Sequence, residues 1–141
     1  TDGSEHAIEA AEAAEALLHP DVEFLLVSVV PEREDPVDMA GGFEGPLIDD
    51  DEAAELAAER EAAGRRAILD TARTIHEPIT AHLLEDDDPG RALCRLAEDQ
   101  GADVIVIGAS EKSALQRLFE GSVMKYLTKH APCPVLVVRH S

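Results

Sequence analysis

The sequence predicts an α/β fold built on a parallel β-sheet. Helical patterns alternate with short apolar runs along the whole chain. The apolar runs show no regular polar alternation, as expected of strands that helices cover on both faces. Strands that alternate with helices form parallel sheets. The chain has 141 residues, the size of one domain, so residues 1–141 are expected to form a single domain.

The first helix is expected from about Ser4 to Leu18, because the segment is rich in Ala and Glu and His19-Pro20 stops it. Residues 24–30 are apolar and β-rich and end at Pro31, which predicts a buried strand. Residues 31–51 are rich in Pro, Gly and acidic residues, which predicts a long loop. A loop of this length in a small domain is more often functional or disordered than incidental.

A second helix is expected over residues 51–76, weakened slightly by Gly64. Its predicted inner stripe is Leu56, Ala63, Ala67 and Ile68. A short strand follows over residues 79–84. Asp88-Pro89 then opens a third helix that closes at Gly101, with proline at its first position. Its predicted inward residues are Ala92, Leu93, Leu96 and Ala97.

Two further buried strands are expected at residues 104–107 and 134–138. A polar loop containing Ser110 and Ser113 and a helix over about residues 122–130 lie between them. The alternation begins on a helix, although a turn such as Asp2-Gly3-Ser4 normally follows a strand. We therefore expect that a first strand, which would precede Thr1, is missing from this sequence.

The chain is strongly acidic, with 30 Asp and Glu against 12 Lys and Arg and a formal net charge of −18. This charge argues against a nucleic-acid partner and against a polybasic membrane contact, since both require basic patches. No apolar run is long enough to cross a bilayer, and we expect a cytoplasmic protein. Few lysines, 3% aromatic residues and a coat of carboxylates resemble adaptation to high salt, as in a halophile.

Residues that commonly carry enzyme or metal chemistry are not arranged for it. The six His show no metal-ligand spacing, and neither a GxSxG nor a GxxxxGK[ST] motif occurs. We expect no enzyme and no metal site. The acidic runs at residues 49–51 and 86–88 are interpreted as solvated surface. Cys94 and Cys133 form no CxxC pair and are expected to be buried free thiols in a reducing compartment.

Several segments resemble the universal stress protein family: DGSEHA, LLVSVVPE, GADVIVIGAS, LFEGSV and HAPCPVLVV, in this order along nearly the whole chain. The resemblance implies a doubly wound, Rossmann-like sheet of five parallel strands in the order 3-2-1-4-5, similar to the adenine nucleotide alpha hydrolases. The missing first strand would be the central one. The resemblance also implies a dimer. Many members of the family bind ATP, whereas others do not.

In doubly wound sheets ligands bind beyond the carboxyl ends of the strands, where the strand order reverses. Here that crevice lies between the turn at Asp2 and the loop after Gly108. The family's nucleotide motif (Gly, two residues, Gly, nine residues, Gly, then Ser or Thr) falls on Gly108, Glu111, Gly121 and Ser122. A glycine-containing loop that leads into a helix is a phosphate cradle. The alternative is structural, with Ser122 as a helix cap and Gly108 as the end of a strand.

Glu111 departs from this motif, because it adds a Cβ and a negative charge where the family has glycine. A carboxylate at ~4 Å from a phosphate charge costs about 1 kcal/mol in water and several times more in a shielded cleft. Lys112 or a shared Mg²⁺ ion could offset part of that cost. The motif therefore leaves open whether phosphate binds here.

Three other residues match family positions that contact the nucleotide. Asp2 matches an aspartate that contacts the nucleoside, and its alternative role is to cap the first helix with Glu5 completing a capping box. Val29 matches a main-chain contact to adenine, and its alternative role is a core valine. Val123 follows the Gly-Ser pair and carries the same two alternatives.

The last strand supplies a separate argument for dimerisation. In the order 3-2-1-4-5 it lies at a sheet edge. Because its residues are apolar, we expect it to pair with the same strand of a second copy across a two-fold axis. These residues are Val135, Leu136, Val137 and Val138.

We therefore hypothesise a dimeric, cytoplasmic stress-response protein that binds ATP or another adenine nucleotide, together with Mg²⁺, as a regulatory ligand. The alternative is a nucleotide-free interaction module whose phosphate loop is blocked by Glu111. A slow ATP hydrolase or adenylyl-transfer enzyme is a third hypothesis, for which the sequence offers no base and no electrophilic clamp.

Overall fold

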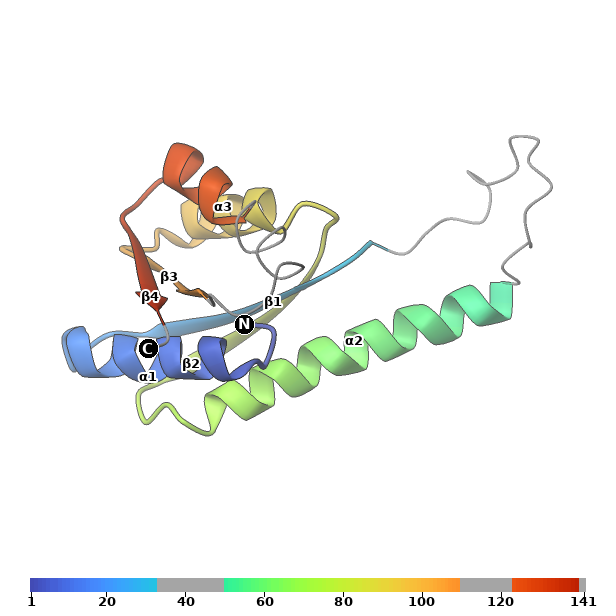
Figure 1. The fold of residues 1–141 in the computed structure, drawn as a ribbon, viewed down its shortest axis with the longest axis horizontal. Coiled ribbons are helices and arrows are strands. Elements are labelled where there is room, and N and C mark those ends of the chain that lie inside the picture. The colour runs from blue at the N-terminus through green and yellow to red at the C-terminus, as the bar shows by residue number, and fades with distance from the viewer. Residues whose placement is uncertain (33–49, 110–122, 140–141) are drawn as a thin grey trace.

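The computed structural model describes residues 1–32, 50–109 and 123–139. Within these residues, four helices alternate with four strands, as predicted (Figure 1). In chain order they are α1 (Glu5–Leu17), β1 (Phe24–Val30), α2 (Asp50–Ala72), β2 (Ile79–Glu85), α3 (Pro89–Gln100), β3 (Ile105–Ala109), a helix over residues 123–130, and β4 (Val135–Arg139). Of the loop predicted over residues 31–51, residues 33–49 lie outside the described residues, and so does the predicted polar loop at Ser110 and Ser113.

The strands pair in parallel, but as two separate pairs. β1 pairs with β2 from Phe24↔Ile79 to Val30↔Glu85, and β3 pairs with β4 from Ile105↔Val135 to Ala109↔Arg139. The predicted single sheet is therefore not formed by the described residues, where β1 and β3 share no ladder. The helices still form two outer layers, with α1 and α2 on one side of the strands and α3 and the helix over residues 123–130 on the other (Figure 1).

The main hydrophobic core lies where α2 packs against the β1–β2 pair, and α1, which packs mainly against β3 and β4, contributes Ala11 to it. Its buried members are Ala11, Leu26, Ile68 and Ile75, with Phe24, Ala72, Ile79 and Leu83 packed around them. The face of α1 that turns inward consists of alanines, namely Ala10, Ala11 and Ala14. Small side chains allow the helix backbone to approach the strands closely.

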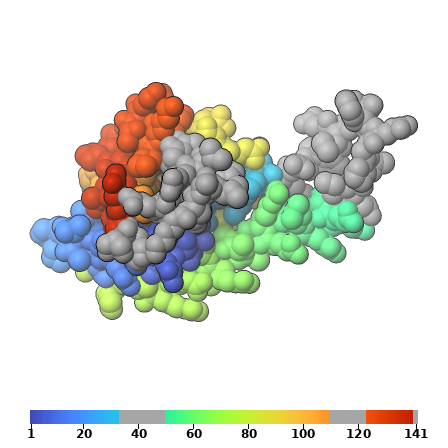
Figure 2. Space-filling view, viewed as in Figure 1, coloured from blue at the N-terminus to red at the C-terminus, as the bar shows by residue number. Residues whose placement is uncertain are grey.

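Helix α2 is longer than the strands that it covers. Its 23 residues span roughly 35 Å, whereas the seven residues of β1 span roughly 23 Å. The amino-terminal half of α2 therefore protrudes from the body of the molecule (Figures 1 and 2). This overhang corrects the predicted inner stripe, because Leu56 is 41% exposed and Ala63 is exposed. Ala67 and Ile68 are buried as predicted.

Gly64 and Thr71 are the buried residues of α2 that the sequence did not predict to face inward. A Cβ on Gly64 would lie 2.5 Å from Leu83 Cδ1 and 2.8 Å from Val30 Cγ1. The glycine that was expected to weaken the helix therefore lets it pack closely against the strands. The helix also ends four residues earlier than predicted, at Ala72. A turn follows, in which the Thr74 amide donates a hydrogen bond to the Thr71 carbonyl.

Helix α3 begins and ends as predicted. The Asp88 side chain accepts a hydrogen bond from the Arg91 amide at 3.1 Å, and Pro89 occupies the first turn. Gly101 follows the helix in the left-handed region, with φ 63°. Among the helices of the described residues, none has the length and apolarity that a membrane span requires.

Candidate functional site

The turn that carries Asp2 lies between β1 and β3. On one side, the Thr1 nitrogen donates a hydrogen bond to the Val27 carbonyl of β1, and the Thr1 and Thr71 hydroxyl oxygens are 2.7 Å apart. On the other side, the first turn of α1 packs against Gly108 of β3. The structure therefore brings the first turn of α1, which follows Asp2, against Gly108, although His6 and Gly108 are about 100 residues apart in the sequence.

A glycine is required at residue 108 because the backbone of α1 approaches it closely, and not because of an unusual backbone angle. A Cβ on Gly108 would lie 2.7 Å from the His6 carbonyl carbon and 3.2 Å from the Ala7 nitrogen. The residue lies inside β3, paired with Val138, rather than after the strand as the sequence suggested. The absence of a side chain therefore keeps α1 and the carboxyl end of β3 in contact.

Asp2 presents an ionised carboxylate at the surface of this turn. Partial burial opposes ionisation, but hydrogen bonds from Ser4 outweigh it and hold the pKa of Asp2 below its ordinary value. The Ser4 amide donates to Asp2 Oδ1 at 2.9 Å. The alternative role given to Asp2, as the cap of α1, was wrong, because Ser4 is the N-cap and accepts a hydrogen bond from the Ala7 amide at 3.3 Å. Asp2 is thus available to accept hydrogen bonds from a ligand.

Two further predicted contact residues are half-buried. Val29 lies in β1, one residue before its end, opposite Leu84 of β2. Val123 is the first described residue of the helix over residues 123–130. Glu111, Gly121 and Ser122 lie outside the described residues, so the structure places only Gly108 of the predicted phosphate motif, and Val123, which follows it.

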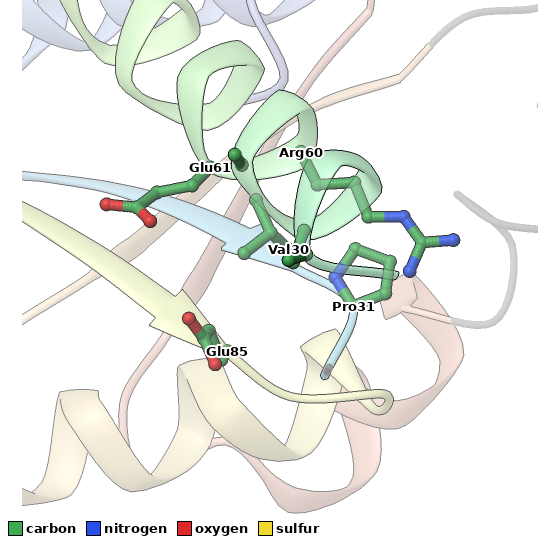
Figure 3. Close-up of a pocket in the computed structure, with 8 residues that line it drawn as sticks. Val30, Pro31, Arg60, Glu61 and Glu85 are labelled. Atoms are coloured by element: carbon green, nitrogen blue, oxygen red, sulfur yellow. The ribbon is translucent and has the colours of Figure 1, made fainter. Parts of the chain in front are cut away.

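A hollow of about 260 Å³ adjoins the carboxyl ends of β1 and β2, under the protruding part of α2 (Figure 3). In the close-up, the Glu61 and Glu85 side chains lie on one side of Val30, and Arg60 extends past Pro31 on the other. The remaining lining residues are Ala54, Ala57 and Ala58. No sequence signal indicated this hollow, because it arises from the overhang of α2.

The acidic run at residues 86–88 is held by hydrogen bonds within the protein. Asp86 accepts hydrogen bonds from the Asp88 amide at 2.8 Å and from Arg91 Nη2 at 3.1 Å. These bonds lower the pKa of Asp86, and the bond from the Asp88 amide has the largest effect. Asp87 accepts from the Glu32 amide at 3.1 Å. In residues 1–32, 50–109 and 123–139 no group of three or more His, Cys, Asp or Glu is arranged to hold a metal ion.

The family model for the universal stress protein family matches residues 1–139, which is nearly the whole chain. The chain belongs to the universal stress protein family. A putative universal stress protein of Staphylococcus epidermidis is 51% identical over 45 residues, or 32% of this chain. That match spans only 27% of the relative's length.

Solved universal stress proteins share the fold. One, solved in complex with cAMP, superposes with a TM-score of 0.60 at 20% identity, covering 100% of this chain and 94% of the other. Another, from Archaeoglobus fulgidus in complex with dAMP, gives 0.55 at 22% identity, covering 95% and 88%. At this identity the likeness establishes the α/β fold of the family.

Proposed function

We propose that this universal stress protein binds an adenine nucleotide as a regulatory ligand and does not turn it over. The observation that carries the proposal is the contact between the first turn of α1, which follows Asp2, and Gly108 at the carboxyl end of β3. Ligands of doubly wound folds bind at such an edge. The two solved relatives bound to cAMP and dAMP support adenine as the base.

In this proposal each named residue has one task. The Asp2 carboxylate accepts a hydrogen bond from a sugar hydroxyl, for which its ionised state is suited. The main chain at Val29 contacts the base. Gly108 lets α1 pack against the end of β3, where the motif begins, and backbone N–H groups at Gly121, Ser122 and Val123 would bind the phosphate at the start of a helix.

Glu111 sets the limit on how many phosphates bind well. Its carboxylate repels a polyphosphate more than a monophosphate, because the Coulomb energy grows with the ligand's charge. We therefore propose that AMP-like nucleotides bind more tightly than ATP, and that ATP binds best with Mg²⁺. The second candidate function, a nucleotide-free interaction module, rests on the same Glu111 and requires that no adenine nucleotide binds at all.

We also propose that the two strand pairs belong to one sheet of order 3-2-1-4-5, in which β1 to β4 are strands two to five. In the described residues no ladder joins β1 to β3. A central strand that ended at Thr1 would pair with both strands and satisfy the backbone N–H and C=O groups on their facing edges. The hydrogen bond from the Thr1 nitrogen to the Val27 carbonyl is the kind of main-chain bond that such a strand would make to β1. In this order β4 is an edge strand, and we propose that it forms the homodimer contact.

Purified protein tests the nucleotide proposal directly. The chain has no Trp and one Tyr, so a co-purified adenine would dominate its ultraviolet spectrum near 260 nm. Stripped protein in molar KCl is then titrated by calorimetry with AMP, cAMP and Mg-ATP, with GMP as the base control. Saturable binding of the adenine nucleotides is expected. No heat with any of them would favour the nucleotide-free module.

Asp2→Ala tests where the nucleotide binds. Removing a charged acceptor is expected to weaken AMP binding roughly 10-fold or more. Asp21→Ala is the matched control, because Asp21 is an exposed aspartate with 89% of its side chain accessible. Equal affinities of the two variants would contradict the assignment of Asp2.

The remaining parts of the proposal concern activity and environment. With Mg-ATP we expect no phosphate or adenylate release above the uncatalysed rate. We place the protein in the cytoplasm, without nucleic-acid or membrane partners, and adapted to high salt. A charge of −18 repels itself in dilute buffer, so the melting temperature is expected to rise as KCl increases to molar concentration.

A further inference from the structure

Helix α2 contacts the residues on both sides of Asp2. Thr1 precedes Asp2, and its hydroxyl oxygen lies 2.7 Å from the hydroxyl oxygen of Thr71 in α2. Gly3 follows Asp2 with φ 75°, and a Cβ on it would lie only 3.0 Å from the Cα of Ala67, one turn before Thr71. Contacts with α2 on both sides therefore fix the backbone position of Asp2.

The contact between Thr1 and Thr71 belongs to a chain of hydrogen bonds with a defined direction. The Thr71 hydroxyl donates its single proton to the Ala67 carbonyl at 2.9 Å, so toward Thr1 it acts as the acceptor. The Thr1 hydroxyl donates to Thr71, and its oxygen accepts from the Gly3 amide at 3.1 Å. Thr71 is only 1% exposed, so bulk water does not compete for these bonds. The chain joins the amide that follows Asp2 to the backbone of α2.

The same helix packs against the residues on both sides of Val29. Ser28 and Val30 are buried and point toward Gly64 of α2, where a Cβ would lie 2.8 Å from Val30 Cγ1 and 3.4 Å from Ser28 Oγ. Val29 itself points to the opposite face of β1, because side chains alternate along a strand. One helix therefore supports both segments that carry a predicted contact residue, the turn with Asp2 and the end of β1.

We propose that α2 is the element that responds when the nucleotide binds, and that Thr71 is the positioning residue that couples it to the site. This inference rests on the proposed function, because it takes Asp2 as a contact to the ligand. Thr71 is too buried to touch a ligand and acts through Thr1 and Gly3. Such coupling is reciprocal, so a nucleotide that fixes the Asp2 turn also stabilises α2. The amino-terminal half of α2 protrudes from the body (Figure 2), so the response reaches a surface outside the site.

Two substitutions at residue 71 distinguish the hydroxyl group from the packing of the side chain. Thr71→Val keeps the shape and removes the hydroxyl, whereas Thr71→Ser keeps the hydroxyl and removes a methyl group. Thr74→Val is the matched control, because the Thr74 hydroxyl also donates to a carbonyl of α2, that of Thr71 at 2.8 Å, but takes no part in the chain to the Asp2 turn. All three variants should lower the melting temperature, so a merely structural role of Thr71 would not distinguish them.

The full chain in molar KCl is titrated with AMP by calorimetry, and amide hydrogen exchange is measured with and without saturating AMP. In the natural protein AMP should slow exchange in residues 64–71 of α2 more than in α3. Thr71→Val should weaken AMP binding about 5-fold, the scale of one hydrogen bond, and its α2 should not respond to saturating AMP. Without AMP, the same variant should exchange the Gly3 amide faster. Thr71→Ser and Thr74→Val should keep the natural affinity and response.

Equal AMP affinities of Thr71→Val and Thr71→Ser would overturn the inference, and so would an unchanged Gly3 amide in Thr71→Val. The calorimetry distinguishes these failures from a failure of the proposed function. AMP binding by the natural protein without slower exchange in α2 would overturn this inference alone. No heat with AMP would overturn the proposed function, and the inference with it, because no ligand would then act on α2.

Discussion

Gly108 of β3 lies directly against the backbone of His6 in the first turn of α1. A Cβ on Gly108 would lie 2.7 Å from the His6 carbonyl carbon, which is closer than real side chains approach. This contact holds the first turn of α1, which follows Asp2, against the carboxyl end of β3. The stability of the protein and the proposed nucleotide site therefore depend on the same glycine.

Gly108→Ala should destabilise the protein by about 2 kcal/mol or more, because α1 or β3 must move to admit the methyl group. The nucleotide affinity should fall at the same time. Chemical denaturation measures the first effect and calorimetry with AMP the second. Gly101→Ala is the control, since Gly101 has φ 63° but nothing within 4 Å, and should cost only about 1 kcal/mol. A Gly108→Ala protein as stable as the control would refute the contact.

Glu111→Gly should tighten ATP binding, because it removes a negative charge beside the proposed phosphate site. Glu111→Gln distinguishes the effect of the charge from the effect of side-chain size, because it keeps a side chain of similar size and removes the charge. We expect both variants to bind ATP better than the natural protein, with the larger gain for glycine. Titration of each variant with Mg-ATP measures this order. Unchanged or weaker binding in both would show that Glu111 is not the obstacle.

The contact between Glu15 and the turn after α2 should make stability depend on pH. Glu15 accepts from the His76 amide at 2.5 Å and the Glu77 amide at 3.1 Å. The hydrogen bond from the His76 amide, and to a smaller extent the other hydrogen bonds, lower the pKa of Glu15 below its ordinary value of 4.5. A carboxyl group with a lowered folded-state pKa stabilises the protein above its unfolded pKa, and the stabilisation is lost as the pH falls through the folded value.

Glu15→Gln should therefore lower the melting temperature at neutral pH, and the gap to the natural protein should narrow as the pH falls below 4.5. Glu12→Gln controls for the loss of one negative charge from α1, because Glu12 is exposed. Thermal melts across this range give the gap directly. A gap that stays constant down to acid pH would show that Glu15 is not bonded to this turn.

Val137→Pro should dissociate the proposed dimer without breaking the β3–β4 pair. Ile105 donates to the Pro134 carbonyl, so in a parallel ladder the Leu136 and Val138 amides point to β3 and the Val135 and Val137 amides point away. Proline at residue 137 removes only an outward donor. Light scattering should report a folded monomer.

Leu136→Pro is the matched control for Val137→Pro, because it removes an inward donor and should destabilise the protein itself. If the Val137→Pro protein remains a dimer, β4 is not the contact.

Local signals predicted most of the elements. The apolar run at residues 24–30 predicted β1 to the residue, and Asp88-Pro89 with Gly101 predicted both ends of α3. These signals are carried by neighbouring residues, so they can be read without the fold. Leu56 was predicted wrongly, because periodicity cannot show that α2 extends beyond the strands that it covers.

The site was less predictable because its geometry depends on distant parts of the chain. A family motif indicated Gly108, but the reason for a glycine there lies in His6, which no local pattern connects to it. Gly64 was interpreted as a weak point of a helix, whereas Val30 and Leu83 require it to be small. The hollow beside Val30 had no signal at all, since it results from the length of α2.

Amide chemical shifts measured while AMP is added test most directly where the nucleotide binds. We predict that the largest shifts occur at Gly3, Ser4 and Gly108, on the two sides of the contact between α1 and β3. Largest shifts at Ala54 and Ala57, which line the hollow under α2, or no shifts at saturating AMP, would contradict the proposed site.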